Sequence, residues 1–276
     1  MKVQFKHQLT SSFLQWFDYT LISQGAAFRN ISSPFYQMND NRYFGYTSFA
    51  TPFGQLVSDN SIGGATILSG VYVNNNFLAR GQSGLILDFQ RGRVLLPTTF
   101  TGSAVSGDFA MKEFDIVYTT KTDDMLVSSS RFSTKPRYAI PFTGLSDDEI
   151  LTPVVFVSKQ TSSDVAYEFG GLRNSISNFR CLAITDNQWQ LDGLESIFTA
   201  QKDKNFPFLT DTPFNEFGDL KTGGYDYNSI LLNANPSELV YIKSCVFTRF
   251  ENSFNQRINP QFNFAVIEVT IEKTRF

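Results

Sequence analysis

The C-terminal segment 262–276 alternates between apolar and polar side chains, as a β-strand with one buried face does. Its apolar positions are Ala265, Ile267, Val269 and Ile271, and its polar positions are Glu268, Thr270, Glu272 and Thr274. Residues 239–250 predict a second long strand. Because the side chains of a strand point alternately to its two faces, this pattern predicts an antiparallel sheet with one buried and one solvated face.

The tract from Gly64 to Thr120 contains short apolar runs separated by turn residues. The predicted strands are 65–73, 77–79, 85–89, 93–96 and 109–118. Asn74 and Asn75 tolerate a positive φ, and Gly92 supplies a left-handed position in the next turn. Consecutive strands joined by such turns predict an antiparallel meander.

Large apolar residues recur at helical spacing in the segment 12–28. They are Phe13, Trp16, Phe17, Leu21 and Phe28. Ser12, with Gln15 three residues later, matches a capping box and predicts that the helix begins there. The aromatic stripe predicts core packing against the sheet, and the alternative is a docking surface for a neighbouring subunit.

Shorter elements complete the pattern. Residues 154–157 and 178–185 predict buried strands. A short helix is expected over 125–130, with its cap in the Thr-Asp-Asp sequence before it, and a short helical piece over 192–200.

Two long segments, 31–61 and 202–228, lack any regular spacing and are rich in Tyr and Phe. Loops of this length are uncommon in compact domains and are usually functional, so we expect both to contact other subunits. The predicted fold class is mainly β to α+β: antiparallel sheets with hairpins, one N-terminal amphipathic helix packed on the sheet, and long aromatic-rich loops.

The length of 276 residues is consistent with a single structural domain over the whole chain. Within it, the pattern separates a helix and long loop (1–61), a β-meander (62–160) and a β-rich C-terminal half (161–276).

Composition narrows the classes of function. The chain has 29 Phe, 18% charged residues and a net charge of −3. Binding to nucleic-acid phosphates needs clustered Lys and Arg, and the densest basic stretches, 91–93 and 202–204, hold two each. No apolar run has the length needed to span a bilayer, and the N-terminal segment lacks the apolar core of a signal peptide. Many aromatics with few charges favour a protein that buries surface in an assembly, and the alternative is an ordinary β-domain with an exterior rich in Ser, Thr and Asn.

Side chains that commonly carry catalysis are scarce. His7 is the single histidine, and no serine or cysteine partner for it is evident. Cys181 and Cys245 match no metal or redox spacing and are expected as free thiols within strands, with a disulfide between them as the alternative. The sequence Gly81-Gln82-Ser83-Gly84 is one residue short of a nucleophile elbow and predicts a tight turn.

Carboxylates remain the other candidates for catalysis, since a pair of them serves glycoside hydrolysis. The candidates are Asp88, Asp108, Asp115, Glu168 and Asp192. Capping, turn formation or solvation accounts for each one separately. We therefore expect no enzymatic activity and no catalytic, cofactor-binding or metal-binding residues.

One tract resembles a known class of proteins. It comprises 58–65, 69–74 and 81–94, with the order turn, strand, Asp88-Phe89 and Gly92-Arg93-Val94. This order resembles virion structural proteins of tailed bacteriophages. The size, mild acidity and richness in Phe, Asn and Thr are similar to those of the ring proteins between capsid and tail.

The resemblance implies a non-enzymatic subunit of an oligomeric ring in the neck or tail, of the tail-completion or head–tail joining type, through which DNA passes. Its partners would be copies of itself and other virion proteins, with no sequence-specific nucleic-acid binding, no membrane and no small-molecule substrate. Its location would be the virion, assembled in the host cytoplasm. The alternatives are a carbohydrate-binding or glycan-cleaving adhesion domain, and a baseplate or fibre-attachment subunit.

Overall fold

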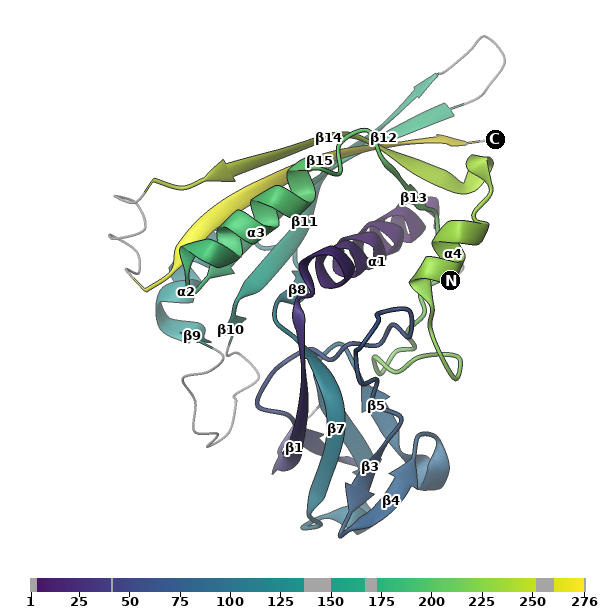
Figure 1. The fold of residues 1–276 in the computed structure, drawn as a ribbon, viewed down its shortest axis with the longest axis vertical. Helices are drawn as coiled ribbons and strands as arrows, with labels where there is room; N and C mark the ends of the chain where they lie inside the picture. The colour runs from purple at the N-terminus through teal and green to yellow at the C-terminus, as the bar shows by residue number, and fades with distance from the viewer. Residues whose placement is uncertain (1–3, 41, 137–149, 167–172, 252–260, 276) are drawn as a thin grey trace.

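The computed structural model describes residues 4–40, 42–136, 150–166, 173–251 and 261–275. A six-stranded sheet lies at the top of Figure 1, a seven-stranded sheet lies at the bottom, and helices α1 (Phe5–Gly25) and α3 (Gln188–Thr199) lie under the upper sheet. The predicted fold class, mainly β to α+β with antiparallel sheets and an N-terminal helix packed on a sheet, is confirmed.

The six-stranded sheet has the order β13-β14-β15-β12-β11-β8. Its strands are β8 (Asp115–Tyr118), β11 (Val154–Ala166), β12 (Arg173–Thr185), β13 (Asn205–Pro207), β14 (Leu239–Arg249) and β15 (Asn263–Arg275). All neighbours are antiparallel except β11 and β8. The alternation predicted for the C-terminal segment is confirmed, because Ala265, Ile267, Val269 and Ile271 are all buried in the core beneath this sheet.

Helix α2 (Asp123–Ser133) covers part of the opposite face of the same sheet. Leu126 and Val127 of this helix pack in a second cluster with Phe156 and Leu182. The helix starts two residues before the predicted segment because Thr122 is its N-cap. Beyond it, β9 (Thr134–Pro136) and β10 (Ile150–Thr152) form a small parallel pair.

The seven-stranded sheet has the order β4-β3-β7-β1-β2-β6-β5. Its strands are β1 (Phe28–Met38), β2 (Tyr46–Ala50), β3 (Gly70–Val73), β4 (Asn76–Ala79), β5 (Ile86–Asp88), β6 (Arg93–Pro97) and β7 (Val105–Lys112). The hairpins β3–β4 and β5–β6 are confirmed, with positive φ at Asn74, Asn75 and Gly92.

The predicted meander over 64–120 is wrong. Strands β1 and β2 from the N-terminal part of the chain lie in the middle of this sheet, between β7 and β6. The strand predicted over 65–73 is regular only from Gly70. The strand predicted over 109–118 divides at residues 113–114 into β7 and β8, which belong to different sheets. The residue order does not reveal this change of sheet, because apolar, β-prone residues stand on both sides of the division.

The long loop predicted over 31–61 is also wrong in its first part, which forms β1 and β2. Strand β1 pairs with β7 on one side and β2 on the other, yet most of its side chains are exposed or only partly buried. Backbone hydrogen bonds rather than side-chain burial therefore define it, and no hydrophobic period marks it in the sequence.

Helix α1 begins at Phe5, seven residues before the predicted start. The Ser12 hydroxyl is no cap. It donates to Gln8 O and accepts a hydrogen bond from Leu209 N. The helix ends at Gly25, with Ala26 in the left-handed region, and Phe28 already belongs to β1.

The predicted core stripe of α1 is confirmed, because Phe13, Trp16, Phe17 and Leu21 are all buried. The rings of Phe13 and Phe179 stack at 4.0 Å between centroids, and those of Phe17 and Phe198 at 4.1 Å. Phe198 lies on α3, which begins four residues before its predicted start because the Asn187 side chain caps Gln190 N at 3.0 Å.

The segment 202–228 is largely irregular, as predicted, apart from β13 and the start of α4 (Tyr227–Asn233). Four of its aromatic side chains, however, are already buried in the single chain. Phe206, Phe214, Tyr225 and Tyr227 are buried within the chain itself. The expectation that these side chains anchor another subunit is wrong, because they extend the core beside α1 instead.

Candidate functional site

Some of the exposed apolar side chains of the chain lie on strands of the six-stranded sheet. Five large ones lie on its strands β8, β11 and β14: Val117, Tyr118, Val165, Tyr241 and Val246. These strands lie at the two sides of the sheet rather than in its middle. Exposed apolar groups on edge strands are unusual, since natural edges are commonly guarded by charge or proline.

Strand β14 has an open edge over most of its length. The short β13 pairs only with residues 239–241, and Ile242 adds hydrogen bonds to Asp203 and Lys204. From Lys243 to Arg249 no described strand pairs with β14 on the side away from β15. Among the described strands, none takes up its backbone donors and acceptors on that side, as at the edge of a sheet.

Strand β11 has a corresponding open edge at the other side of the sheet. Strand β8 pairs with residues 154–157, and Thr119 N donates to Val157 O at 2.9 Å. Residues 159–166 pair with β12 alone among the strands that the structure describes. This half of β11 is rich in Ser and Thr, and Val165 is 50% exposed.

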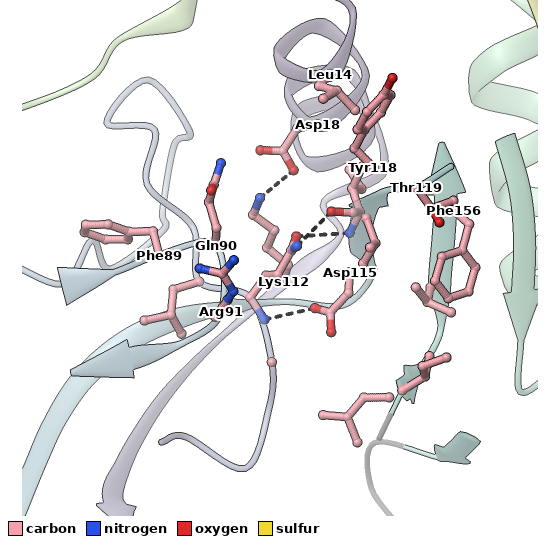
Figure 2. A pocket seen from close by; sticks show the side chains of 18 of the residues that line it. Leu14, Asp18, Phe89, Gln90, Arg91, Lys112, Asp115, Tyr118, Thr119 and Phe156 are labelled. Carbon is pink, nitrogen blue, oxygen red and sulfur yellow. Dashed lines mark hydrogen bonds and ion pairs between the residues drawn. The ribbon is translucent and has the colours of Figure 1, made fainter. Parts of the chain in front are cut away.

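A cleft of about 930 Å³ lies between the two layers (Figure 2). One part of its lining is basic and consists of Arg42, Arg91, Arg93, Lys112 and Lys121. Another part is apolar and consists of Leu126, Ile150, Leu151, Val154 and Phe156. Whether the cleft can bind a charged ligand therefore depends on which of its charged side chains already have hydrogen bonds or ion pairs within the chain.

Several charged groups of the cleft are engaged by neighbouring groups of the chain. Lys112 Nζ at the end of β7 lies 2.7 Å from Asp18 Oδ1 on α1, as Figure 2 shows. Asp115 Oδ1 accepts a hydrogen bond from Gln55 N at 2.9 Å. These contacts join α1 and β8 to the seven-stranded sheet. We therefore assign the cleft the role of joining the layers.

Asp88 illustrates the same structural use of a carboxylate. Its side chain is fully buried and accepts hydrogen bonds from Tyr43 Oη at 2.5 Å and from Arg91 N at 3.0 Å. Burial, followed by the negative charge of Asp88, raises the pKa of Tyr43 to about 12. Asp88 thus fixes the β5–β6 turn against the loop that carries Tyr43.

The other sequence candidates lie apart on different elements. Asp108 is exposed on β7, and Asp192 on α3 lies 2.7 Å from Arg249 Nη2. Glu168 lies outside the described residues. His7 is exposed on α1. The predicted tight turn at 81–84 is confirmed as a 3-10 turn with positive φ at both of its glycines.

Both cysteines are free thiols in neighbouring parts of the six-stranded sheet, as expected. Cys181 on β12 and Cys245 on β14 flank β15, pairing with Ile267 and Val269. Burial raises the pKa of Cys181 well above its usual value and that of Cys245 to about 12. Both thiols therefore stay protonated and act as small apolar side chains.

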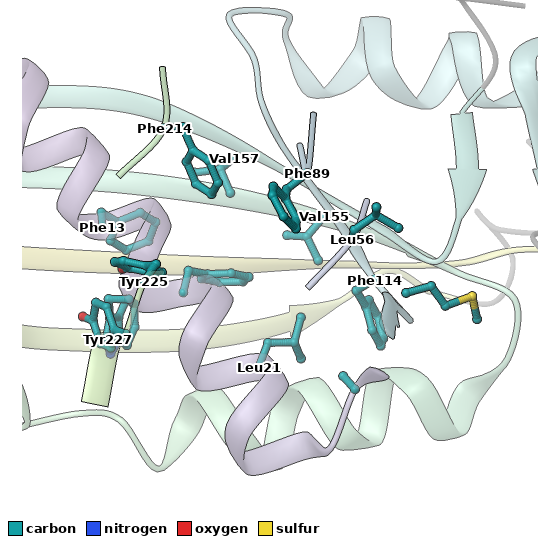
Figure 3. Packing of buried hydrophobic residues seen from close by; sticks show 14 of the residues in the cluster. Phe13, Leu21, Leu56, Phe89, Phe114, Val155, Val157, Phe214, Tyr225 and Tyr227 are labelled. Atoms are coloured by element: carbon teal, nitrogen blue, oxygen red, sulfur yellow. The ribbon is translucent and has the colours of Figure 1, made fainter. Parts of the chain in front are cut away.

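Asp59 is a buried carboxylate that the sequence analysis missed. Its Oδ1 accepts hydrogen bonds from Ser61 N at 2.9 Å and Tyr227 N at 3.2 Å. Its Oδ2 and the hydroxyls of Tyr225 and Tyr227 are buried without a hydrogen-bond partner among the described residues. Figure 3 shows the two tyrosines side by side next to α1. In the sequence, the Asp59-Asn60-Ser61 pattern is typical of an Asx-turn, and this pattern could have identified Asp59 as a structural carboxylate.

Burial, partly offset by the donors of Ser61 and Tyr227, raises the pKa of Asp59 above its ordinary value of 3.8. A carboxyl with a raised folded-state pKa destabilises the fold once it ionises, and this penalty disappears as pH falls towards the ordinary value. We expect Asp59→Asn to be more stable than the wild type at pH 7, because the amide oxygen can keep both backbone donors.

Urea unfolding of both proteins from pH 4 to pH 8 measures this effect. The stability advantage of Asp59→Asn should grow as pH rises through the raised pKa and then level off. A variant less stable than the wild type at pH 7 would show that the charge itself holds the Tyr225–Tyr227 segment in place.

Comparison with models of protein families and with curated protein sequences gives no match for this chain. No helix within the described residues has both the length and the apolar character needed to cross a membrane.

Proposed function

We propose that the protein is a non-enzymatic structural subunit that assembles with copies of itself into a ring in the neck or tail of a phage virion. The observation that carries this proposal is the position of the exposed apolar residues. Five of them lie on β8, β11 and β14, at the two sides of the six-stranded sheet, and no described strand covers residues 243–249 of β14 or 159–166 of β11 from outside. Open edges with exposed valine and tyrosine suit contact with other copies.

Two further aromatics supply contact points away from the sheet edges. Phe44, between β1 and β2, is 99% exposed, and Trp189, in the first turn of α3, is 83% exposed. They belong to different layers of the molecule. A subunit placed between other virion proteins needs anchors of this kind on separate surfaces, and Trp, Tyr and Phe are enriched at such contacts.

The phage setting is supported by the sequence resemblance of the tract 58–94. In the fold, this tract forms the hairpins β3–β4 and β5–β6 of the seven-stranded sheet. The ring would place the six-stranded layers of neighbouring copies side by side. DNA at most passes through its opening, in keeping with the net charge of −3.

Native mass spectrometry and negative-stain imaging of the purified chain test this proposal. We expect closed multimers of one defined copy number, populated increasingly as the protein concentration is raised. A protein that stays monomeric at every concentration and on its native particle would overturn it.

One observation favours an adhesion domain as the second candidate. Tyr72 and Phe77 face each other across the β3–β4 hairpin, 5.3 Å apart between ring centroids, and both are exposed. Paired exposed rings can stack on sugars. A glycan array that detects binding to the wild type, lost in Tyr72→Ala, would favour this candidate over the ring.

A further inference from the structure

We infer that the open edge of β14 in one copy pairs with the open edge of β11 in the next copy, so that the six-stranded sheets join into one continuous sheet. This inference rests on the proposed function and specifies its interface. The interface joins two different surfaces of the same chain, so each copy offers one edge to each of two neighbours. Contacts of this head-to-tail type close into rings when the rotation between copies allows it.

Strand direction favours this pairing. Strand β14 is antiparallel to β15, β15 to β12, and β12 to β11. Strands β14 and β11 therefore run in opposite directions across the sheet. When a second copy is placed beside the first in the same orientation, its β14 continues the antiparallel alternation after β11.

The two open stretches also match in length. Residues 243–249 of β14 and 159–166 of β11 are the parts that no described strand covers from outside. Each is long enough for a ladder comparable with the ordinary strand of a globular protein. Neither stretch contains a proline, which would remove a backbone donor from the ladder.

The positions of the two stretches along the sheet differ by about four residues. Val246, in the middle of the β14 stretch, pairs with Glu268 of β15. Ser163, in the middle of the β11 stretch, is level with Glu272 of β15 through Ile176 of β12. Full pairing therefore shifts each copy by about 13 Å along the strands, at roughly 3.3 Å per residue.

A shift of this size is compatible with a closed sheet. Strands β14, β15, β12 and β11 of one copy span about 19 Å at roughly 4.8 Å per strand. A shift of about 13 Å over this width tilts the strands by about 35°, within the range of roughly 35–45° found in closed barrels. The stagger built into one subunit is therefore compatible with a ring of copies.

The charged side chains of both stretches contact groups of the same chain. On β11, Lys159 Nζ donates to Lys6 O at 3.3 Å, and Asp164 Oδ1 accepts a hydrogen bond from Ser175 Oγ at 2.5 Å. Val246 is 52% exposed on β14, and Val165 is 50% exposed on β11. The basic residues of the β14 stretch are held by carboxylates of the same chain. Lys243 lies 3.5 Å from Glu272, and Arg249 pairs with Glu195 and Asp192. Their charge is directed towards the chain itself, which leaves the valines as the outward apolar groups.

Complementary edge variants test the pairing. Val246→Lys blocks the β14 edge and leaves the β11 edge intact, whereas Val165→Lys does the reverse. We expect each variant alone to be monomeric at concentrations at least tenfold above those at which the wild type assembles. An equimolar mixture of the two should form a dimer and nothing larger, because only one pair of intact edges remains.

The matched control is Leu232→Lys, which places the same charge on the exposed surface of α4 and should assemble like the wild type. Circular dichroism and urea unfolding establish that all variants are folded. Should either lysine variant fail to fold, Val246→Cys and Val165→Cys replace them. A bismaleimide should then link these two proteins to each other in the assembled fraction, and link neither in the monomer fraction.

Two results overturn the inference and separate it from the proposed function. If the wild type forms closed multimers and the lysine variants form them equally well, the ring stands and the edge pairing is wrong. If the wild type is monomeric throughout, both are wrong.

Discussion

Phe17→Ala is expected to lower the free energy of unfolding by about 3–5 kcal/mol, the usual cost of truncating a fully buried phenylalanine. Phe17 is 0% exposed and stacks on Phe198 of α3 at 4.1 Å between ring centroids. The truncation therefore removes this ring stacking between α1 and α3 and leaves a cavity under the six-stranded sheet. Urea unfolding followed by far-ultraviolet circular dichroism measures the loss.

Phe44→Ala is the matched control, because this side chain is almost fully exposed. Its free energy of unfolding should stay within about 0.5 kcal/mol of the wild type. An unchanged midpoint for Phe17→Ala, together with lost assembly, would mean that the α1 stripe serves a neighbouring subunit and not the core.

Removing Asp18 gives the second large expected effect. Asp18→Ala leaves the buried ammonium of Lys112 without its carboxylate on α1. Breaking a buried ion pair by deleting one partner costs about 3–5 kcal/mol, and we expect about 3 kcal/mol because Asp18 keeps some exposure to solvent. Chemical denaturation at neutral pH measures the difference.

The same principle predicts a much smaller effect when both charges are replaced. Asp18→Leu combined with Lys112→Met should recover most of the loss, since both charges of the pair are then removed together. Glu113→Gln breaks an exposed pair with Arg29 and should change stability by less than about 1 kcal/mol. A similar loss from both pairs would show that the Lys112–Asp18 contact has no special role between the layers.

Strand β15 and the α1 stripe could be predicted from the sequence because burial on one face leaves a period that is visible in the residue order. Strand β1 could not be predicted, because it is held by pairing with β7 and β2 while most of its side chains meet solvent. The start of α1 was misplaced because Ser12 and Gln15 imitate a cap, although the buried positions continue back to Leu9.

The candidate site depends on how strands of different length lie beside one another, and the order of residues in the sequence does not show this. An open edge exists only because β13 and β8 are shorter than the strands they border, and strand length is the least certain quantity in a sequence prediction. The exposed valines on these edges look in the sequence like any other strand residues. Asp59 likewise owes its raised pKa to burial, and the Tyr227 N–H that partly offsets this effect comes from 168 residues along the chain.

The two short crossings between the layers have a mechanical consequence. Helix α1 passes into β1 through residues 26–27, and β7 passes into β8 through residues 113–114. Phe28 and Lys112, the adjoining ends of β1 and β7, are partners in the ladder. A pulling force on the upper layer therefore reaches both central strands of the lower sheet at the same end and in the same direction. Such a force acts along the strands, so the hydrogen bonds of β1 to β2 and of β7 to β3 are loaded in shear at the same time. The two layers therefore transmit tension as one stiff unit.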